Sequence, residues 1–319
     1  MPEARSPAIQ ASHLTRHFGK FKAVDDVCLD VARGEVFGLL GANGAGKTTA
    51  IRMLCGTLAP SSGAIAVSGV DMVREARRAR ARIGYVTQRF TLYGDLSVRE
   101  NLLLQAGLYG VDGARLQQRL AWALDRLELR ADADERAGRV PLGFQRRLAV
   151  AAALLHEPDV LFLDEPTSGI DPLARQHLWE LVYELTEAGV GVLVTTHYMD
   201  EALFCDRLAL MDRGRVIASG TPQQLLATPM ATPMVEFRLQ GDADCAAWLA
   251  ARPGAREVLP RAGKLRVRLQ AGLDAPAFAA SAHADAAAAG FVLIPEAAAA
   301  PELEDVFVAL LEQGQGAAP

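Results

Sequence analysis

Short runs of apolar residues, each ended by a turn or by polar residues, recur along the first two thirds of the chain. Such runs predict strands that are buried on both faces of a sheet. The segment from Leu96 to about Leu155 is instead predicted to be mostly helical. The predicted buried strands are Val36–Leu40, Ile83–Val86, Val160–Leu163 and Val190–Thr195. Strands that alternate with helices in this way predict an α/β fold.

Shorter patterns surround these strands. They predict strands at Ile9–Thr15 and Val24–Val31 around a turn, a strand at Ala64–Val67, and a hairpin made by Leu208–Met211 and Val216–Ala218. A helix is expected from Thr48 to Leu58, and another over the basic segment Val73–Arg82. A basic helix is usually a solvated face, and a contact with acidic lipid is the alternative.

The pattern changes after two prolines, Pro229 and Pro233, which bracket a predicted linker at 229–234. We therefore expect one domain at 8–228 and a small α+β domain at 235–313. The smaller domain would contain strands Val235–Leu239 and Leu265–Leu269, helices Ala275–Ala289 and Leu303–Leu311, and a frayed tail from Gly314 to Pro319. Dimer contact, regulation and plain stabilisation all remain open as its role.

Two adjacent carboxylates, Asp164 and Glu165, end the strand Val160–Leu163, and Pro166 follows them. Charges at the end of a buried strand are costly unless they meet a cation or take part in chemistry. The carboxyl edge of the strands is where open α/β sheets bind ligands. These two residues are therefore candidates for a catalytic or metal site.

A glycine-rich segment, Gly41–Thr49, follows the strand Val36–Leu40 and fits the pattern G-x-x-x-x-G-K-[ST] of a phosphate-binding loop. In such a loop, backbone N–H groups surround phosphate oxygens, the lysine reaches the β- and γ-phosphates, and the hydroxyl meets Mg²⁺. A plain strand-to-helix turn is the alternative. The predicted nucleotide contacts are Gly41, Asn43, Gly44, Ala45, Gly46, Lys47, Thr48 and Thr49.

Composition is typical of a large globular protein, since 50% of the 319 residues are hydrophobic and the net charge is −5. This charge gives no indication of general affinity for nucleic acid. We expect no signal peptide, because the first twenty residues hold six charged or histidine side chains and no apolar stretch. No apolar run approaches the length of a membrane span, so any membrane-spanning part would be another chain. The four cysteines are scattered without metal-like spacing.

These motifs together resemble the ATP-binding-cassette (ABC) ATPases over about residues 8–228. The residues that match, in the family's order, are Phe18, Gly41–Thr49, Gln88, Asp164, Glu165, Ile170, Asp171 and His197. Within that superfamily, the segments Gln88–Asn101 and Pro141–Leu148 resemble the bacterial drug-exporter group. The segment Pro301–Phe307 is similar to that group's small C-terminal domain.

The resemblance implies a P-loop NTPase cassette with a mixed, mostly parallel sheet, an antiparallel β subdomain and a helical subdomain. It implies ATP hydrolysis with Mg²⁺ that drives transport, in the direction of export, through a separate membrane-spanning permease. The chain would lie at the cytoplasmic face of the inner (plasma) membrane and would not bind nucleic acid. Because the chain has one phosphate loop and one signature, it would act as a homodimer or as a heterodimer with a second cassette.

The resemblance also assigns roles. Phe18 would stack on adenine, with a core phenylalanine as the alternative. Asp164 would hold Mg²⁺ together with Thr48, and Gln88 would ligate Mg²⁺ or bind the attacking water. Glu165 would orient or deprotonate that water. His197 would face the γ-phosphate, with a buried structural histidine as the alternative.

One segment departs from the family. The usual signature Leu-Ser-Gly-Gly-Gln is replaced by Pro141–Gln145, where Leu142 lacks the hydroxyl that would reach the γ-phosphate on the opposite subunit. Gly143 and Gln145, at a helix expected to begin near Gln145, would still offer N–H groups to an anion. We interpret the change as a tolerated variant, and a slow or asymmetric ATPase is the alternative.

Other classes of function remain. A soluble ABC protein acting on ribosomes or DNA would carry two cassettes or long inserted modules, and this sequence has neither. A nucleotide-binding adapter that does not hydrolyse ATP would follow from the altered signature. Import in place of export is a further alternative, and the sequence does not identify the cargo.

Overall fold

The computed structural model describes residues 7–227, 233–240, 244–261, 263–270, 272–296 and 302–316. The chain divides into two compact units, Met1–Pro222 and Gln223–Pro319. This division falls a few residues before the predicted boundary at 228. Most of the predicted linker at 229–234 lies outside the described residues, and Met234 already belongs to a strand.

A six-stranded central sheet forms the core of the first unit, in the order β10-β9-β3-β8-β7-β6. The pairs β3/β8, β3/β9, β7/β8 and β6/β7 are parallel, and β10 is antiparallel to β9. The strands are β3 (Val36–Leu40), β6 (Ile83–Val86), β7 (Val160–Asp164), β8 (Gly191–Thr196), β9 (Arg207–Asp212) and β10 (Arg215–Gly220). The predicted strands are confirmed. Strand β3, which precedes the glycine-rich loop, ends beside Thr195 and Thr196 of β8.

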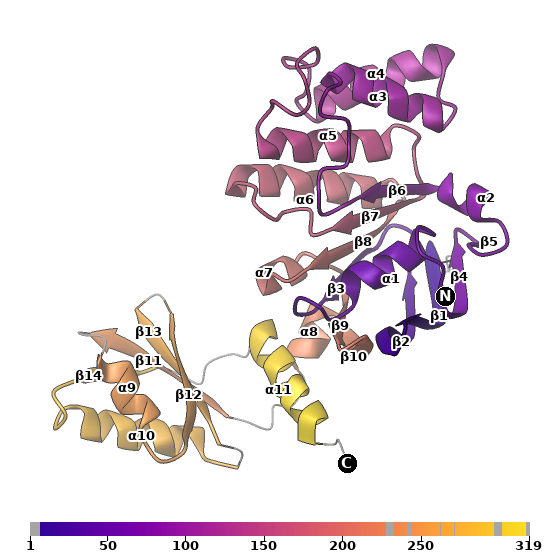
Figure 1. Cartoon of the computed structure of the whole chain (residues 1–319). Coiled ribbons are helices and arrows are strands. Elements are labelled where there is room, and N and C mark those ends of the chain that lie inside the picture. The colour runs from indigo at the N-terminus through magenta and orange to yellow at the C-terminus, as the bar shows by residue number, and fades with distance from the viewer. Residues whose placement is uncertain are drawn as a thin grey trace. The chain divides into compact units, whose positions relative to one another are not determined.

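Both faces of the central sheet are covered, which explains why its strands are apolar without alternation. On one face, Phe37, Leu39 and Phe162 join a single hydrophobic core with helix α1 (Lys47–Leu54). On the other face, helix α6 (Pro172–Glu187) packs against β3 and β8. This packing holds the carboxyl ends of β3, β7 and β8 at one edge of the sheet (Figure 1).

A second, antiparallel sheet has the order β2-β1-β4-β5 and shares the core of α1. Its strands are β1 (Ile9–Phe18), β2 (Phe21–Val31), β4 (Ser62–Val67) and β5 (Val70–Asp71). The two strands predicted around the turn at residues 17–20 are therefore confirmed. This sheet is the antiparallel subdomain that the family resemblance implied.

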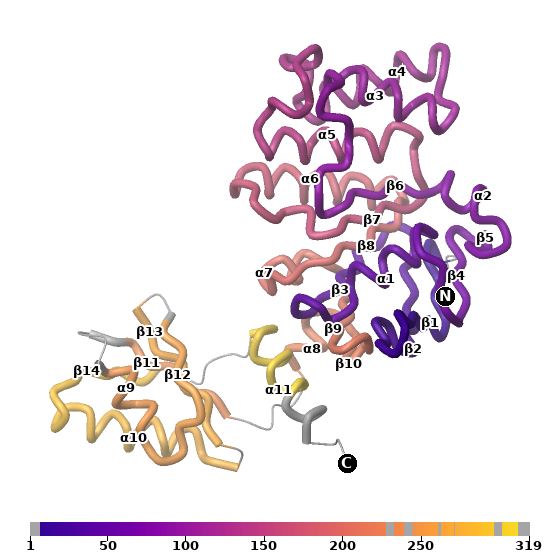
Figure 2. Tube along the Cα trace, in the orientation of Figure 1, coloured from indigo at the N-terminus to yellow at the C-terminus, as the bar shows by residue number. Residues whose placement is uncertain are grey.

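The chain leaves the central sheet after β6, passes through three helices and returns at β7, a path that Figure 2 traces. These helices are α3 (Val98–Leu108), α4 (Gly113–Arg126) and α5 (Leu142–Leu154). Helix α3 begins at a capping box, in which Ser97 and Glu100 satisfy each other's backbone N–H groups. The predicted helical segment is confirmed as the helical subdomain.

In the first unit, three predicted helix boundaries are wrong, each for a local reason. Helix α1 ends at Leu54 and not at Leu58, because Gly56 adopts a left-handed φ of 68°. Helix α2 covers only Ala76–Arg80, because the Asp71 carboxylate accepts hydrogen bonds from two backbone N–H groups, at residues 73 and 74, and holds that stretch as a turn. Helix α5 starts at Leu142 and not near Gln145, since the extended residue Pro141 caps it.

Two short helices complete the first part of the chain. Helix α7 (Met199–Ala202) follows β8, and α8 (Pro222–Leu226) begins with a proline, whose fixed φ suits the first helical position.

The second unit is built around a four-stranded antiparallel sheet in the order β12-β13-β11-β14. Its elements are β11 (Met234–Gln240), α9 (Asp244–Ala250), β12 (Ala255–Arg261), β13 (Lys264–Leu269), α10 (Ala275–Ala286), β14 (Val292–Pro295) and α11 (Leu303–Gly316). The α+β class is as predicted, but α9, β12 and β14 were not predicted. The frayed tail is wrong for 314–316, which continue α11, and its last three residues lie outside the described part.

Candidate functional site

The predicted phosphate-binding loop connects β3 to α1, as its pattern requires. A Cβ atom on Gly41 would lie 2.3 Å from the Met211 carbonyl oxygen, and one on Gly46 would lie 2.5 Å from that of Ala23. Gly46 also has a left-handed φ of 106°. Only glycine fits these two positions, because any side chain would collide with backbone. The sequence therefore encodes a tight loop around the N-terminus of α1.

Lys47 is almost fully buried inside this loop. Its Nζ donates hydrogen bonds to the carbonyl oxygens of Gly41 at 2.7 Å and Ala42 at 3.2 Å, and lies 3.9 Å from Oε1 of Glu165. Burial lowers the pKa of Lys47 from its usual value, although Glu165 and Asp164 act in the opposite direction. A cation held by backbone carbonyls at a helix N-terminus is suited to an anionic ligand.

Asp164 ends β7 and is 1% exposed. Its Oδ1 accepts hydrogen bonds from the hydroxyls of Thr195 at 2.7 Å and Thr48 at 3.3 Å. Burial raises the pKa of Asp164, which the two hydroxyls counteract only in part. A buried carboxylate beside a threonine hydroxyl offers the hard oxygen ligands that Mg²⁺ prefers.

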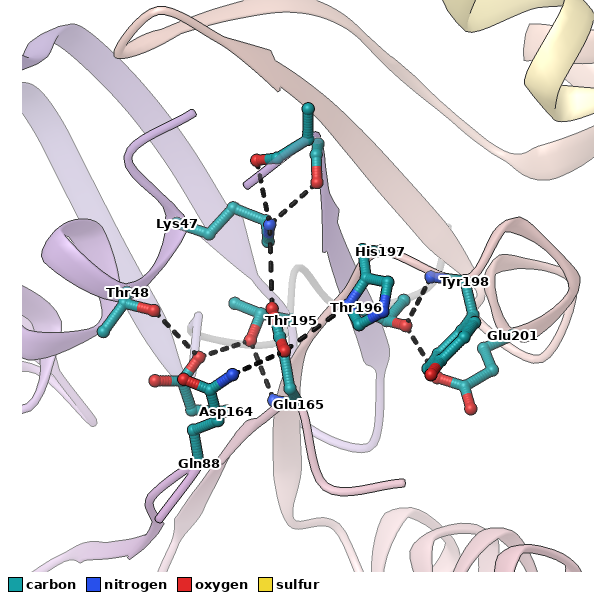
Figure 3. Close-up of polar contacts among 12 residues, drawn as sticks. Lys47, Thr48, Gln88, Asp164, Glu165, Thr195, Thr196, His197, Tyr198 and Glu201 are labelled. Carbon is teal, nitrogen blue, oxygen red and sulfur yellow. Dashed lines mark hydrogen bonds and ion pairs between the residues drawn. The ribbon is translucent and has the colours of Figure 1, made fainter. Parts of the chain in front are cut away.

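Glu165 lies between three of the predicted site residues (Figure 3). Its Oε2 accepts a 2.8 Å hydrogen bond from the Gln88 side chain and lies 3.4 Å from Nδ1 of His197, while Oε1 faces Lys47. Its φ of 49° is left-handed, which costs a non-glycine residue roughly 1–2 kcal/mol. Strain at a residue that also joins a buried charged cluster is a recurrent property of functional sites.

The turn that carries His197 is fixed by its neighbours. The Thr196 hydroxyl donates to Oε2 of the fully buried Glu201 at 2.7 Å and accepts from the backbone N–H of Tyr198 at 2.9 Å. The Tyr198 ring lies 4.1 Å from the His197 ring. Nδ1 of His197 is buried without a hydrogen-bond partner in the described part of the chain. His197 therefore faces the Glu165 cluster and is not a satisfied core histidine.

Phe18 and Asn43 lie at the surface. The Phe18 ring is 47% exposed at the end of β1, with the Arg16 guanidinium 4.8 Å from its centre, so it is not a core side chain. Its hairpin touches the loop, because the backbone of Ala23 lies against Gly46.

The signature residues do not join this cluster. No hydrogen bond or ion pair between described residues joins Gly143 or Gln145 to the loop at 41–49, and the Gln145 side chain donates to the carbonyls of Ala137 and Val140 in its own subdomain. Phe144 is buried, whereas Leu142 is 46% exposed. The composite site with a second cassette therefore stays a prediction.

Thr195 was not predicted as a site residue, although it organises both carboxylates. Its hydroxyl donates to Asp164, and its carbonyl and hydroxyl oxygens both accept from the Glu165 N–H at 3.1 Å. The signal in the sequence was a pair of hydroxyl residues, Thr195 and Thr196, at the end of an otherwise apolar strand.

No cluster of three or more His, Cys, Asp or Glu side chains suited to a metal occurs among the described residues. A Mg²⁺ ion here would therefore take part of its ligand shell from phosphate oxygens or water, as Mg²⁺ usually does. Among the described helices, none combines the length and the apolar character that crossing a membrane requires.

Comparison with known proteins identifies the family. Residues 24–168 match the protein family described as ABC transporter. The chain is 49% identical over 219 residues to the probable multidrug ABC transporter ATP-binding protein YbhF of Escherichia coli (strain K12), covering 69% of this chain but only 38% of that protein. It is 43% identical over 238 residues to the Nod factor export ATP-binding protein I of Paraburkholderia xenovorans (strain LB400), covering 74% and 77% of the two chains.

Solved structures show the same relationship. The structure of an ATP-binding subunit of an ABC transporter superposes with a TM-score of 0.65 at 31% identity, covering 68% of this chain and 91% of that one. A dimeric cassette in a post-hydrolysis state with ADP and Pi gives a TM-score of 0.62 at 25% identity, covering 67% and 98%. The α/β fold thus agrees with that of solved ABC cassettes, and the chain belongs to the ABC transporter family.

Proposed function

We propose that this chain hydrolyses ATP and thereby drives export through a separate membrane-spanning partner. The observation that carries the proposal is the position of Glu165, which lies between Lys47, Gln88 and His197 and next to the buried Asp164. Phosphoryl transfer depends mainly on positioning and on electrostatic stabilisation, and this cluster offers both.

The loop supports binding of a nucleoside triphosphate. Two glycines at which a Cβ would collide with backbone let the chain close around phosphate oxygens, and the N-terminus of α1 opens directly after them. Lys47 would exchange its carbonyl partners, Gly41 and Ala42, for the β- and γ-phosphates. Phe18, exposed on the adjoining hairpin, would stack on the base.

The pair Thr48 and Asp164 fits Mg²⁺, because the carboxylate and the hydroxyl already share a 3.3 Å hydrogen bond and both supply oxygen. When bound there, the ion neutralises charge that develops on the phosphates. Ionic ligation would also relieve the unfavourable burial that raises the pKa of Asp164. Gln88 contacts Glu165 in this structure, so its alternative as a metal ligand would require its side chain to turn.

Hydrolysis would follow from proton transfer at Glu165. The carboxylate accepts a proton from water as the water oxygen bonds to the γ-phosphorus and the bond to the leaving oxygen of ADP breaks. Gln88 and His197 hold that carboxylate and the water in line, while Lys47 and the loop N–H groups stabilise the equatorial oxygens.

The proposal of export rests on the relatives. One is described as a multidrug transporter protein, another as a Nod factor export protein, and a third, 37% identical over 234 residues and covering 75% of its own length, as a linearmycin resistance protein of Bacillus subtilis (strain 168). With one phosphate loop per chain, two cassettes would combine, as homodimer or heterodimer. The pair would lie at the cytoplasmic face of the inner membrane, attached through the permease.

Co-expression of the chain with candidate permeases from the same genome tests the proposal. We expect the two proteins to co-purify from membranes in detergent and to hydrolyse ATP when Mg²⁺ is present, and we expect Glu165→Gln to abolish turnover without loss of the complex. Turnover by the chain together with failure to co-purify with any membrane protein would favour the soluble ABC ATPase. Nucleotide binding without turnover would favour the adapter.

A further inference from the structure

A cavity of about 230 Å³ lies between the helical subdomain and helix α6 of the first unit, away from the phosphate loop. One wall is α5 with the end of α4, and the other is α6 with the segment that follows β7 (Figure 1 shows the two helices side by side). The apolar lining includes Leu127, Val150, Ile170, Leu178 and Leu181. The cavity is large enough for a small organic molecule, since a single water needs only about 10–15 Å³.

Of the three arginines that line the cavity, two form ion pairs with carboxylates and one does not. Arg147 pairs with Glu128 at 2.5 Å, and Arg126 pairs with Glu184 at 2.7 Å. Arg146 has no carboxylate partner among the described residues, and its Nη1 donates only to the backbone carbonyl of Thr87 at 3.0 Å. The wall therefore carries one uncompensated guanidinium.

Unused donors reinforce this imbalance. The Nε atoms of Arg146 and Arg147 are both buried and lack a hydrogen-bond partner in the described part of the chain. Gly143, which also lines the cavity, belongs to the first turn of the 13-residue helix α5, whose dipole favours an anion at this end.

The one carboxylate on the opposite wall, Glu180, forms no ion pair with Arg146 among the described residues. It accepts a 2.8 Å hydrogen bond from Gln176, one turn earlier on α6. The cavity thus combines an apolar body with the Arg146 guanidinium, which lacks a carboxylate partner among the described residues, and this combination suits a ligand with an apolar part and an anionic head.

We propose that this cavity is a binding site for a small amphipathic monoanion, with its carboxylate on Arg146 and its apolar part against α5 and α6. Such a ligand would join the signature helix to the core, because the cavity is also lined by Pro166, next to Glu165, and by Val86, two residues before Gln88. The inference goes beyond the proposed function and does not depend on turnover.

Four probes that separate the two halves of the ligand test this proposal by calorimetry with the full chain. Octanoate carries both halves, octanol only the apolar body, octylammonium the wrong charge, and acetate only the head. We expect octanoate to bind at least tenfold more tightly than the other three, because a charge-assisted hydrogen bond contributes about 1.5–3 kcal/mol. Equal affinity for octanoate and octanol would overturn the anionic part of the proposal.

Three variants locate the binding. Arg146→Met should weaken octanoate at least tenfold and leave octanol unchanged, whereas Ala174→Phe, which fills the cavity from α6, should weaken both. Arg74→Met, at an exposed arginine outside the cavity, is the matched control and should change neither. Octanoate binding that survives both cavity variants would place the ligand elsewhere and refute the site. Far-ultraviolet circular dichroism of each variant verifies that it is folded.

Discussion

The side-chain amide of Gln88 donates a 2.8 Å hydrogen bond to Oε2 of Glu165, and so joins the ends of two neighbouring strands across the site. Gln88 lies two residues beyond the end of β6, and Glu165 directly follows β7. Because these strands are paired in parallel, both residues emerge at the same edge of the sheet. The bond orients the carboxylate while its other oxygen faces Lys47. The first two predictions, both at Glu165, depend on this arrangement.

Glu165→Gln should retain ATP binding and lose nearly all hydrolysis. The amide has the same shape as the carboxylate but cannot accept the proton of the attacking water, and loss of such a base typically costs ~10²–10⁴-fold in rate. Phosphate release assays on the purified protein measure this loss. Glu187→Gln, at an exposed position on α6, is the control and should behave as the parent. Parent-like turnover by Glu165→Gln would remove Glu165 from the role of base.

The same variant should accumulate as a closed dimer when ATP is present. Two bound nucleotides would bridge the cassettes, and without hydrolysis nothing would separate them. Multi-angle light scattering with and without ATP measures the change in mass. Monomers at every ATP concentration would contradict a homodimeric site and leave a heterodimer with a different cassette as the surviving arrangement.

Phe18→Ala should raise KM for ATP while kcat changes little, because a ring that stacks on adenine contributes equally before and in the transition state. Loss of an aromatic contact of about 0.5–1.5 kcal/mol corresponds to roughly a two- to tenfold rise in KM. Phe21 pairs with Phe18 across the hairpin and is 65% exposed, so Phe21→Ala is a matched control. Equal effects of the two substitutions would exclude a specific role for Phe18.

The sequence predicted the elements with strong local signals. The glycine positions of the loop, the apolar runs of the central sheet and the two carboxylates are local patterns, and all were located correctly. The order of the strands was not predicted, because the placement of β3 between β8 and β9 depends on pairing between distant segments. The same holds for Thr195, whose role appears only once β8 lies beside β7.

The second unit was harder to predict because its signals are weak. Strand β12 contains Pro260, which argues against a strand, but β12 lies at the edge of its sheet, where a proline is tolerated. Strand β14 has only four residues and ends in a proline at the opposite edge. Helix α10 was predicted to reach Ala289, because alanine favours helix. It ends at Ala286, and a turn follows in which Gly290 has a left-handed φ of 81°.

Asp164→Asn should abolish hydrolysis yet stabilise the nucleotide-free protein at neutral pH. Burial raises the pKa of Asp164 in the folded state, so the folded protein binds a proton more readily than the unfolded chain does. The contribution of this group to stability is therefore fully present below its unfolded pKa and is lost as pH rises through the folded pKa. The asparagine, which never ionises, should avoid that loss.

Calorimetric Tm values of the parent and Asp164→Asn at about pH 7.5 and about pH 4 test this sign. We expect the variant to melt at the higher temperature near neutrality, and the difference to shrink on acidification. With saturating Mg²⁺ and ATP the order should reverse, because only the carboxylate ligates the ion well. A parent that is more stable than the variant at neutral pH without nucleotide would contradict the effect of burial.

The altered signature is best tested at Leu142 alone. Restoring glycine at 144 as well would remove a phenylalanine that is only 7% exposed, and truncation of a buried phenylalanine costs about 3–5 kcal/mol. Leu142 is 46% exposed at the start of α5, so a small residue there should be tolerated. Leu142→Ser supplies the missing hydroxyl, and Leu142→Ala removes the same bulk without it.

We expect Leu142→Ser to turn over within a few-fold of both the parent and Leu142→Ala. The first turn of α5 keeps its free N–H groups and its dipole, so an anion on the opposite cassette would still be bound without the hydroxyl. If that hydroxyl were needed, the restored charge-assisted hydrogen bond should contribute ~1.5–3 kcal/mol, which is at least tenfold in rate. A tenfold gain in kcat for serine over alanine would therefore identify this chain as a slowed ATPase, whereas equal rates would show that the site has been rebuilt around a different first turn.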